Sequence, residues 1–145
     1  MSEQLIKAAK IAFASQYSFY VKAHQFHWNV TGINFQELHS LFETIYSEVY
    51  NSIDDFAEKI RALGAYAPGA FGRFSMLSHI ADETQVLPGE AMVAELLEDC
   101  DKMRRVIKMV YDITEAEGEH GFSNFLAERQ DAFGKHAWML RATAK

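Results

Sequence analysis

The segment that decides the fold is residues 65–87, AYAPGAFGRFSMLSHIADETQVL, which joins two predominantly helical halves of the chain. It is too long for a tight turn, and it lets the chain cross from one end of a helix bundle to the other before the next helix begins. Because apolar side chains are frequent in it, we expect it to pack against the protein or against a neighbouring subunit. Residues 75–80 are expected to form a short helix within it.

On both sides of this connection, apolar residues recur every three or four positions, as they do in amphipathic helices. Helix-breaking residues divide the chain into four helical blocks of roughly 25 residues. These breakers are Thr31-Gly32, Gly64 through Gly72, Pro88-Gly89 and Gly118 through Gly121. Residues 34–37, NFQE, resemble a capping box and predict the start of the second helix. We therefore expect residues 1–145 to form a single all-α domain, a ferritin-like four-helix bundle with one long crossover.

The composition excludes several classes of protein. The chain has 145 residues, 49% of them apolar, and a net charge of -6, which argues against a dedicated nucleic-acid surface and is compatible with attracting cations. Its single cysteine, Cys100, falls among core positions of a helix and cannot form an internal disulfide, so a reducing compartment is expected. No apolar run approaches the ~20 residues that span a bilayer, and residues 1–10 lack the core of a signal peptide. We expect a cytoplasmic protein.

Five residues with metal-ligand chemistry stand at fixed separations in the first half of the chain. They are His27, His39, Glu43, Asp54 and Glu58. The second and third are four residues apart, as are the last two, so each of these pairs projects from one face of a helix. Two imidazoles with three carboxylates make a mixed nitrogen and oxygen set that suits iron, manganese or zinc.

The two ligand pairs of the second helix cannot hold one metal ion within a single chain. Glu43 and Asp54 face the same way but are separated by about 16 Å along the helix, at 1.5 Å per residue. If two copies of the helix cross antiparallel near Glu48, the His39/Glu43 pair of one chain meets the Asp54/Glu58 pair of the other. The spacing therefore predicts two identical intersubunit sites per dimer.

Residues 22–64, KAHQFHWNVTGINFQELHSLFETIYSEVYNSIDDFAEKIRALG, resemble the signature region of the Dps family, the DNA-protection-during-starvation mini-ferritins. The separations of 12, 4, 11 and 4 residues between the five ligands match the ferroxidase site of that family. Residues 137–142, AWMLRA, are similar to its closing segment, so the resemblance covers nearly the whole chain.

The resemblance implies a hollow dodecameric shell with iron sites at its two-fold interfaces. At these sites Fe(II) is oxidised, preferably by hydrogen peroxide, and the ferric product is stored inside as a mineral. Such a protein is an iron-storing ferroxidase that protects against oxidative stress. By this resemblance His27 and His39 ligate iron from one chain, and Asp54 and Glu58 from its partner.

Two residues at the expected site have more than one interpretation. Glu43 stands where the family usually has Asp, so its longer side chain is expected to reach the second iron differently. Trp28, beside a ligand, resembles the family's tryptophan near the site, which is able to supply an electron, and it equally fits an aromatic residue of an interface. His24, three residues before His27, fits an auxiliary ligand or a buried, hydrogen-bonded histidine, and we expect the second.

Two other functions fit parts of the pattern. One is a DNA-compacting shell protein, but residues 1–4 carry no basic side chain, so we expect no DNA binding. The other is a shell that sequesters zinc without redox turnover, because zinc accepts the same ligands and competes with iron for them.

Overall fold

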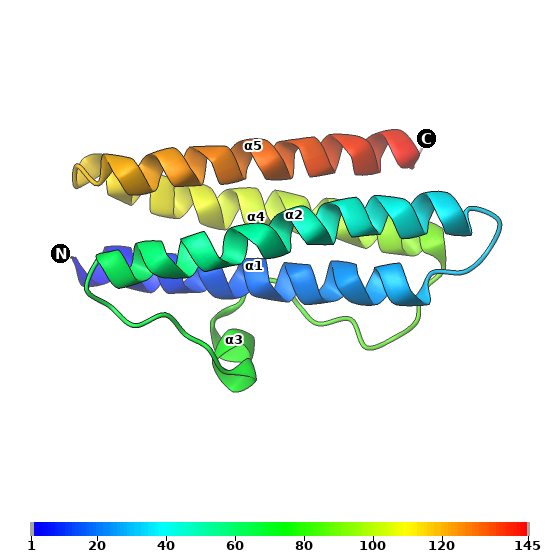
Figure 1. Ribbon diagram of the computed structural model, residues 1–145, viewed down its shortest axis with the longest axis horizontal. Helices are drawn as coiled ribbons and strands as arrows, with labels where there is room; N and C mark the ends of the chain where they lie inside the picture. The colour runs from blue at the N-terminus through cyan, green and yellow to red at the C-terminus, as the bar shows by residue number, and fades with distance from the viewer. Residues whose placement is uncertain (1, 145) are drawn as a thin grey trace.

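The computed structural model describes residues 2–144, which form five helices and no strand (Figure 1). The helices are α1 (Glu3–Asn29), α2 (Phe35–Ala62), α3 (Phe71–Leu77), α4 (Gly89–Ala116) and α5 (His120–Thr143). The four long ones pack side by side as a bundle, with α1 beside α2 and α4 beside α5. The expected all-α class and the four helical blocks are confirmed.

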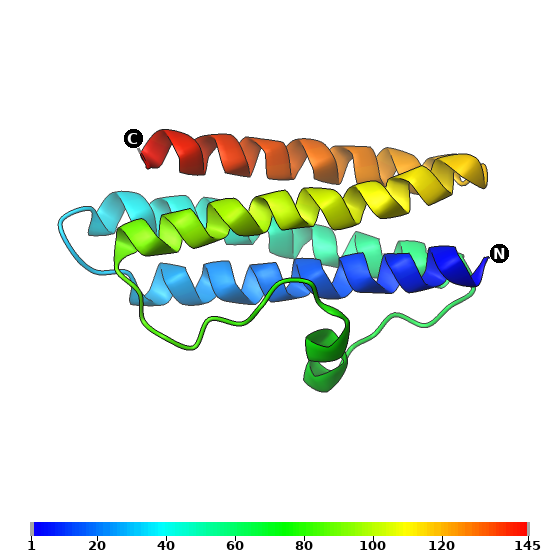
Figure 2. The same cartoon turned by 180° about the vertical axis from the view of Figure 1, so that it is seen from behind.

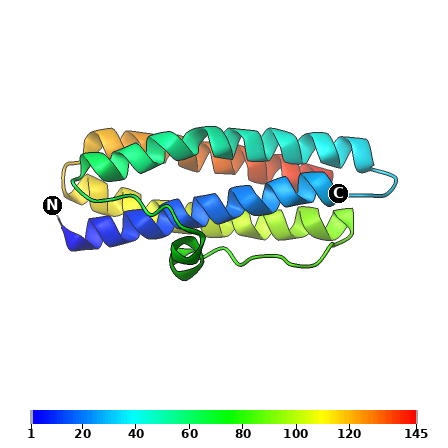
Figure 3. The same ribbon diagram turned by 60° about the horizontal axis from the view of Figure 1, so that its bottom comes forward.

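The direction of the helices explains why the connection between α2 and α4 is long. Figures 1 and 2 show that α1 and α2 run antiparallel, as do α4 and α5, whereas α2 and α4 run in the same direction. The chain must therefore return along the whole bundle after α2, and it does so over the outer side of α1, where α3 lies (Figure 3). This is the single long crossover of the ferritin-like bundles, as expected.

The short helix of the crossover spans Phe71–Leu77, so it begins four residues before the predicted 75–80 and ends three residues before it. Ser78 ends it, because its backbone is extended and its hydroxyl both accepts from the N–H of Ile80 and donates to the carbonyl of Ile80. This local turn offers the backbone an alternative to another helical turn. The predicted boundary was therefore wrong.

Part of the crossover packs against its own chain, as expected. Phe74 and Ile80 are buried, and the ring of Phe74 stacks on Tyr17 of α1 at 4.4 Å between centroids. Phe71 and Met76 remain 81% and 79% exposed. The inner side of the crossover thus belongs to the core, and its outer side is left for solvent or another chain.

The ends of α2 follow the predicted signals. Asn34 is the N-cap residue, but its side chain makes no capping bond, and the backbone carbonyl of Asn34 accepts from the N–H of Leu38 at 3.0 Å. The predicted capping-box residues therefore mark the start without the expected side-chain bond. At the other end Gly64 has φ +93°, a conformation that is readily adopted only without a Cβ.

The core between the helices is rich in phenylalanine. Phe19 of α1 and Phe133 of α5 meet edge to face at 5.1 Å, and both are fully buried. Cys100 is fully buried as expected, and burial raises the pKa of its thiol. α1 and α4 are also joined by a buried ion pair, in which Nζ of Lys22 lies 2.7 Å from Oδ2 of Asp99. None of the helices in residues 2–144 has the length and apolar content needed to cross a membrane.

Candidate metal centre

The fold brings two of the predicted histidines together where α1 ends and α2 begins. His27 lies in the last turn of α1 and His39 in the second turn of α2, on either side of the short loop that joins the helices. Their rings stack at 3.9 Å between centroids with an angle of 14° between planes. His27 is buried and His39 is half-buried.

Each histidine is oriented by the backbone of the other. Nδ1 of His27 lies 2.8 Å from the carbonyl oxygen of His39, and Nδ1 of His39 lies 2.8 Å from the carbonyl oxygen of His27. A carbonyl oxygen can only accept, so both Nδ1 atoms are the donors and Nε2 of each ring is the nitrogen left to act as a metal ligand. The carbonyl of His27 is among the last four of α1, which have no partner within the helix. The helix end therefore fixes the ring of His39, as outer hydrogen bonds do for histidine ligands of metals.

Glu43 completes this half of the site from the next turn of α2. Its Oε1 lies 3.9 Å from Nε2 of His27, and ligand atoms of His27, His39 and Glu43 all lie within 4.8 Å of one another. The side chain of Glu43 is 57% exposed, so this group of two nitrogens and one oxygen is open on one side. An open side leaves coordination positions for further ligands or for a reacting molecule.

The other two predicted ligands lie elsewhere on α2. Asp54 and Glu58 are exposed, one helical turn apart, and neither joins the group of three. The negative charge of Asp54, together with a hydrogen bond between the two carboxyl groups, raises the pKa of the Glu58 carboxyl. A bound cation would relieve this repulsion, so the pair is suited to supply ligands to a metal held mainly by another group.

Trp28 follows His27 in α1, and its ring packs beside His24. Its side chain is 62% exposed, and its ring lies 4.1 Å from that of His24. His24 is half-buried, and its Nδ1 forms a hydrogen bond of 3.0 Å with the hydroxyl of Tyr20. The geometry therefore places Trp28 at the edge of the site, on an exposed surface.

Sequence reasoning missed a polar network in the middle of the bundle. The carboxylate of Glu48 on α2 accepts hydrogen bonds from the guanidinium of Arg129 on α5 and lies 2.8 Å from Nε2 of His136. Burial alone would raise the pKa of Glu48, but the hydrogen bonds from His136 and Arg129 and the charge of Arg129 lower it to about 2. Arg129 and His136 occupy the core-facing stripe of α5 between Leu126 and Leu140, and this three-and-four spacing was the signal that could have revealed them.

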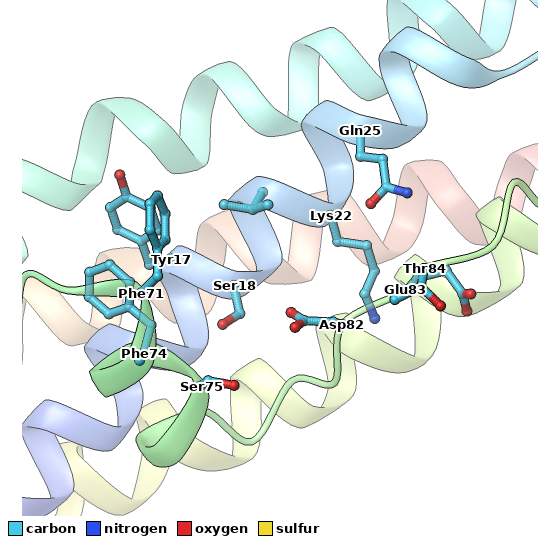
Figure 4. A pocket seen from close by; sticks show the side chains of 12 residues that line it. Tyr17, Ser18, Lys22, Gln25, Phe71, Phe74, Ser75, Asp82, Glu83 and Thr84 are labelled. Carbon is cyan, nitrogen blue, oxygen red and sulfur yellow. The ribbon is translucent and has the colours of Figure 1, made fainter.

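A cavity of about 520 Å³ lies away from the histidines, between α1 and the crossover (Figure 4). Lys22 reaches into it from α1, towards Asp82 and Glu83 of the crossover. The ammonium of Lys22 is held by carboxylates of α4, and no histidine lines the cavity. A lysine beside the cavity disfavours a cation, so we do not assign the metal site to it.

Known proteins are similar to this chain in both fold and sequence. A family model for the ferritin-like domain matches residues 6–145. The chain is 31% identical to DNA protection during starvation protein 2 of Bacillus anthracis, over 98% of this chain and 97% of that protein. It is also 31% identical to general stress protein 20U of Bacillus subtilis, over 98% of each.

Solved structures give the same result. The Dps of Staphylococcus aureus superposes with a TM-score of 0.94 at 27% identity, over 99% of this chain and 97% of that one. A Dps protein of Vibrio cholerae O1, described as a member of a broad superfamily of ferritin-like diiron-carboxylate proteins, has a TM-score of 0.94 at 26% identity, over 99% and 90%. With its fold and its ligand-rich helix pair, this chain belongs to the Dps family of ferritin-like proteins.

Proposed function

We propose that this protein is a ferroxidase and iron store that oxidises Fe(II), preferably with hydrogen peroxide, at sites shared between two subunits. The observation that carries the proposal is the histidine half-site, in which two oriented Nε2 atoms and the carboxylate of Glu43 converge on one open point. Membership of a family with diiron-carboxylate relatives supports iron as the metal.

The site is completed by Asp54 and Glu58 of the partner subunit. On one chain these acids are separated from Glu43 by about 16 Å of helix, so one metal cannot reach both groups. Two chains that cross antiparallel about a two-fold axis near Glu48 would bring each histidine half-site against a pair of acids. Twelve such chains would form a closed shell that holds the ferric mineral.

The chemistry of these ligands fits oxidation of iron as a substrate. Three carboxylates make an oxygen-rich environment that favours Fe(III) over Fe(II), and the open side of the histidine group leaves room for peroxide. Because Nδ1 of each histidine is bonded to a carbonyl group, Nε2 of His27 and Nε2 of His39 are the atoms left to bind the metal. Two-electron reduction of peroxide would avoid release of hydroxyl radical, and so protect against oxidative stress. Trp28 either donates an electron near the site or forms part of the aromatic contacts of the subunit interface.

The test is anaerobic loading of the protein with Fe(II), followed by hydrogen peroxide. Two-electron reduction requires about half a peroxide per Fe(II) oxidised. Rapid formation of Fe(III) at this ratio supports the ferroxidase. If bound iron stays Fe(II), or if the purified protein carries zinc that blocks iron completely, the protein is a zinc-sequestering shell instead.

The size of the particle tests the storage function separately. Light scattering should give a mass of about twelve times the 16.5 kDa of one chain. A stable monomer or simple dimer has no interior, and it would remove iron storage from the proposal.

A further inference from the structure

The first residue of α4 is a glycine whose missing side chain makes room for a close contact between helices. A Cβ placed on Gly89 would lie 2.6 Å from Cδ1 of Leu38 on α2 and 3.4 Å from Cγ2 of Val30, the C-cap residue of α1. Carbon atoms in ordinary contact are about 3.5–4.0 Å apart, so a methyl group at position 89 would force its neighbours to move by roughly 1 Å. The start of α4 therefore packs against α1 and α2 more closely than any residue with a side chain allows.

Backbone conformation does not require a glycine at this position. The glycines with a positive φ are Gly32, Gly64 and Gly118, and Gly89 is not among them. In a helix glycine is less favourable than alanine, because it loses more conformational freedom on folding. At the other glycines of residues 2–144 an added Cβ would meet no atom closer than the 3.7 Å found at Gly134. Close packing is therefore the feature that sets Gly89 apart.

The contact lies at the end of the bundle that carries the histidine half-site. Figure 2 shows the start of α4 beside the end of α1 and the start of α2. Leu38 directly precedes His39 in the sequence, and Val30 comes three residues after His27. Elsewhere α4 packs mainly on α1 and α5. The close approach of α4 to α2 thus occurs next to both proposed histidine ligands.

Neither contact residue has free space to move into. Leu38 is 5% exposed and Val30 is 1% exposed, and protein interiors are packed densely enough that a displaced side chain moves its surroundings. The backbone of this region matters because the carbonyl groups of His27 and His39 each accept from the other ring at 2.8 Å. A displacement of roughly 1 Å between α1 and α2 would lengthen both bonds beyond the usual limit of about 3.2 Å. The two Nε2 atoms would then no longer converge with Glu43.

We propose that Gly89 is a positioning residue of the histidine half-site. Its bare Cα lets α4 pack directly on Leu38 and Val30, and this packing keeps α1 and α2 at the separation at which each histidine reaches the other's carbonyl. The inference rests on the proposed ferroxidase function. It assigns a role in metal binding to the start of α4, a helix that supplies none of the ligands.

The experiment titrates cobalt(II) into the assembled protein, because cobalt(II) accepts imidazole and carboxylate ligands and its d–d absorption reports their geometry. Gly89→Ala should weaken cobalt binding roughly 10–100-fold and change the absorption, as changes to groups that orient metal ligands do. Gly121→Ala is the matched control. Gly121 also lies in the first turn of a long helix, and a Cβ there would meet no atom within 4 Å. This control should bind cobalt as the wild type does.

A compensating change separates this contact from a general loss of packing. Leu38→Val removes both Cδ atoms, so it leaves a gap opposite Gly89 and should weaken cobalt binding severalfold. In the double variant Gly89→Ala/Leu38→Val the new methyl group occupies that gap, and both the affinity and the absorption should return close to those of the wild type. Such non-additivity is expected of two residues in contact. A merely structural effect would lower the midpoint of unfolding and leave the cobalt absorption unchanged.

Wild-type affinity and absorption in Gly89→Ala would overturn the proposal, and so would a double variant that binds cobalt no better than Gly89→Ala. If Gly89→Ala does not assemble, Leu38→Val is compared with the double variant, because the added methyl group tightens binding only if the contact positions the site. These outcomes leave the ferroxidase intact, since oxidation of Fe(II) by the wild type is measured separately. If the wild type forms no Fe(III), the proposed function falls, and this inference falls with it.

Discussion

The two ends of α2 carry the same arrangement of ligands, a pair four residues apart, but the fold completes only one of them. At the first end, His39 and Glu43 meet His27 from α1, and hydrogen bonds to backbone carbonyls fix both rings. At the other end, Asp54 and Glu58 project into solvent. Their mutual repulsion is visible in the raised pKa of Glu58.

This difference indicates how the proposed site, shared between two chains, would divide its functions between the two ends of α2. At the histidine end both rings are oriented before any metal binds, because folding packs α1 against α2 and places each ring against a backbone carbonyl. Within the described residues, no third ligand-type side chain of the same chain lies close enough to Asp54 and Glu58 to form a group of three with them. We therefore expect affinity and orientation to come from the first end, and charge neutralisation to come from a second chain.

The largest effect should come from breaking either end. The double variant His27→Ala/His39→Ala and the double variant Asp54→Ala/Glu58→Ala should each lose about 100-fold or more in Fe(II) oxidation, because changing a residue that merely orients a ligand costs roughly 10–100-fold. Stopped-flow absorbance of Fe(III) measures this. The paired change Glu98→Ala/Asp101→Ala removes two exposed acids of α4 and should have no effect.

Mixing the two inactive variants tests whether the ends belong to different chains. After joint unfolding and reassembly, a site works only where the intact histidines of one chain meet the intact acids of the other. Random pairing gives roughly one quarter of sites active. Mixed shells that stay as inactive as their parents would show that the site is not shared between subunits.

A smaller effect is expected midway between the two ends, where Arg129 and His136 hold Glu48. Glu48→Gln leaves the buried guanidinium of Arg129 without a counter-charge and should lower the free energy of unfolding by about 2 kcal/mol at pH 7, less than the roughly 3–5 kcal/mol of a fully buried pair because Glu48 is 39% exposed. Urea unfolding at fixed protein concentration measures it, with Glu98→Gln as an exposed control.

The interactions of Glu48 with Arg129 and His136 also predict how the free energy of unfolding depends on pH. The pKa of Glu48 is about 2 in the folded protein, below its ordinary value of 4.5. A carboxylate with a lowered folded pKa stabilises the protein above its unfolded pKa, and this contribution is lost as the pH falls towards the folded value. The difference between wild type and Glu48→Gln should therefore be constant above pH 4.5 and disappear as the pH falls towards 2. A difference that grows on acidification would contradict the network.

A shorter acid at position 43 tests whether the length of the Glu43 side chain limits binding of a second iron at the histidine end. Glu43→Asp withdraws the carboxylate by one methylene, and we expect it to raise occupancy of the second iron, with a change in its affinity of less than about tenfold, or about 1.4 kcal/mol. Anaerobic Fe(II) titration by calorimetry measures the number bound. If the variant binds no more iron than the wild type, the length of Glu43 does not limit the second position.

The smallest expected effect is on DNA. Both ends of α2 are rich in acids and the chain has a net charge of -6, so few phosphates can be neutralised. A gel-shift assay with plasmid at ~0.15 M salt should show no retardation. Retardation at micromolar protein would reveal a basic surface that these residues do not provide.

Much of the fold was predictable because helices are encoded locally. The apolar spacing and the helix-breaking residues gave the four long helices, and Gly64 marked the end of α2. The short helix of the crossover was misplaced, since a hydrogen-bonded turn at Ser78 ended it earlier than hydrophobicity suggested. The spacing of Arg129 and His136 within the core stripe of α5 indicated that they are buried, but their role was missed because their partner Glu48 lies on another helix.

The sequence alone determined which chemistry is present: two imidazoles and three carboxylates at separations that a helix of 3.6 residues per turn converts into faces. It also determined that the two pairs on α2 are too far apart for one metal. Tertiary structure decided that His27 reaches His39 and that each ring is oriented by the other's carbonyl. The physical reason is that helical periodicity depends on neighbours in sequence, whereas the packing of α1 against α2 depends on side chains that only the folded chain brings together.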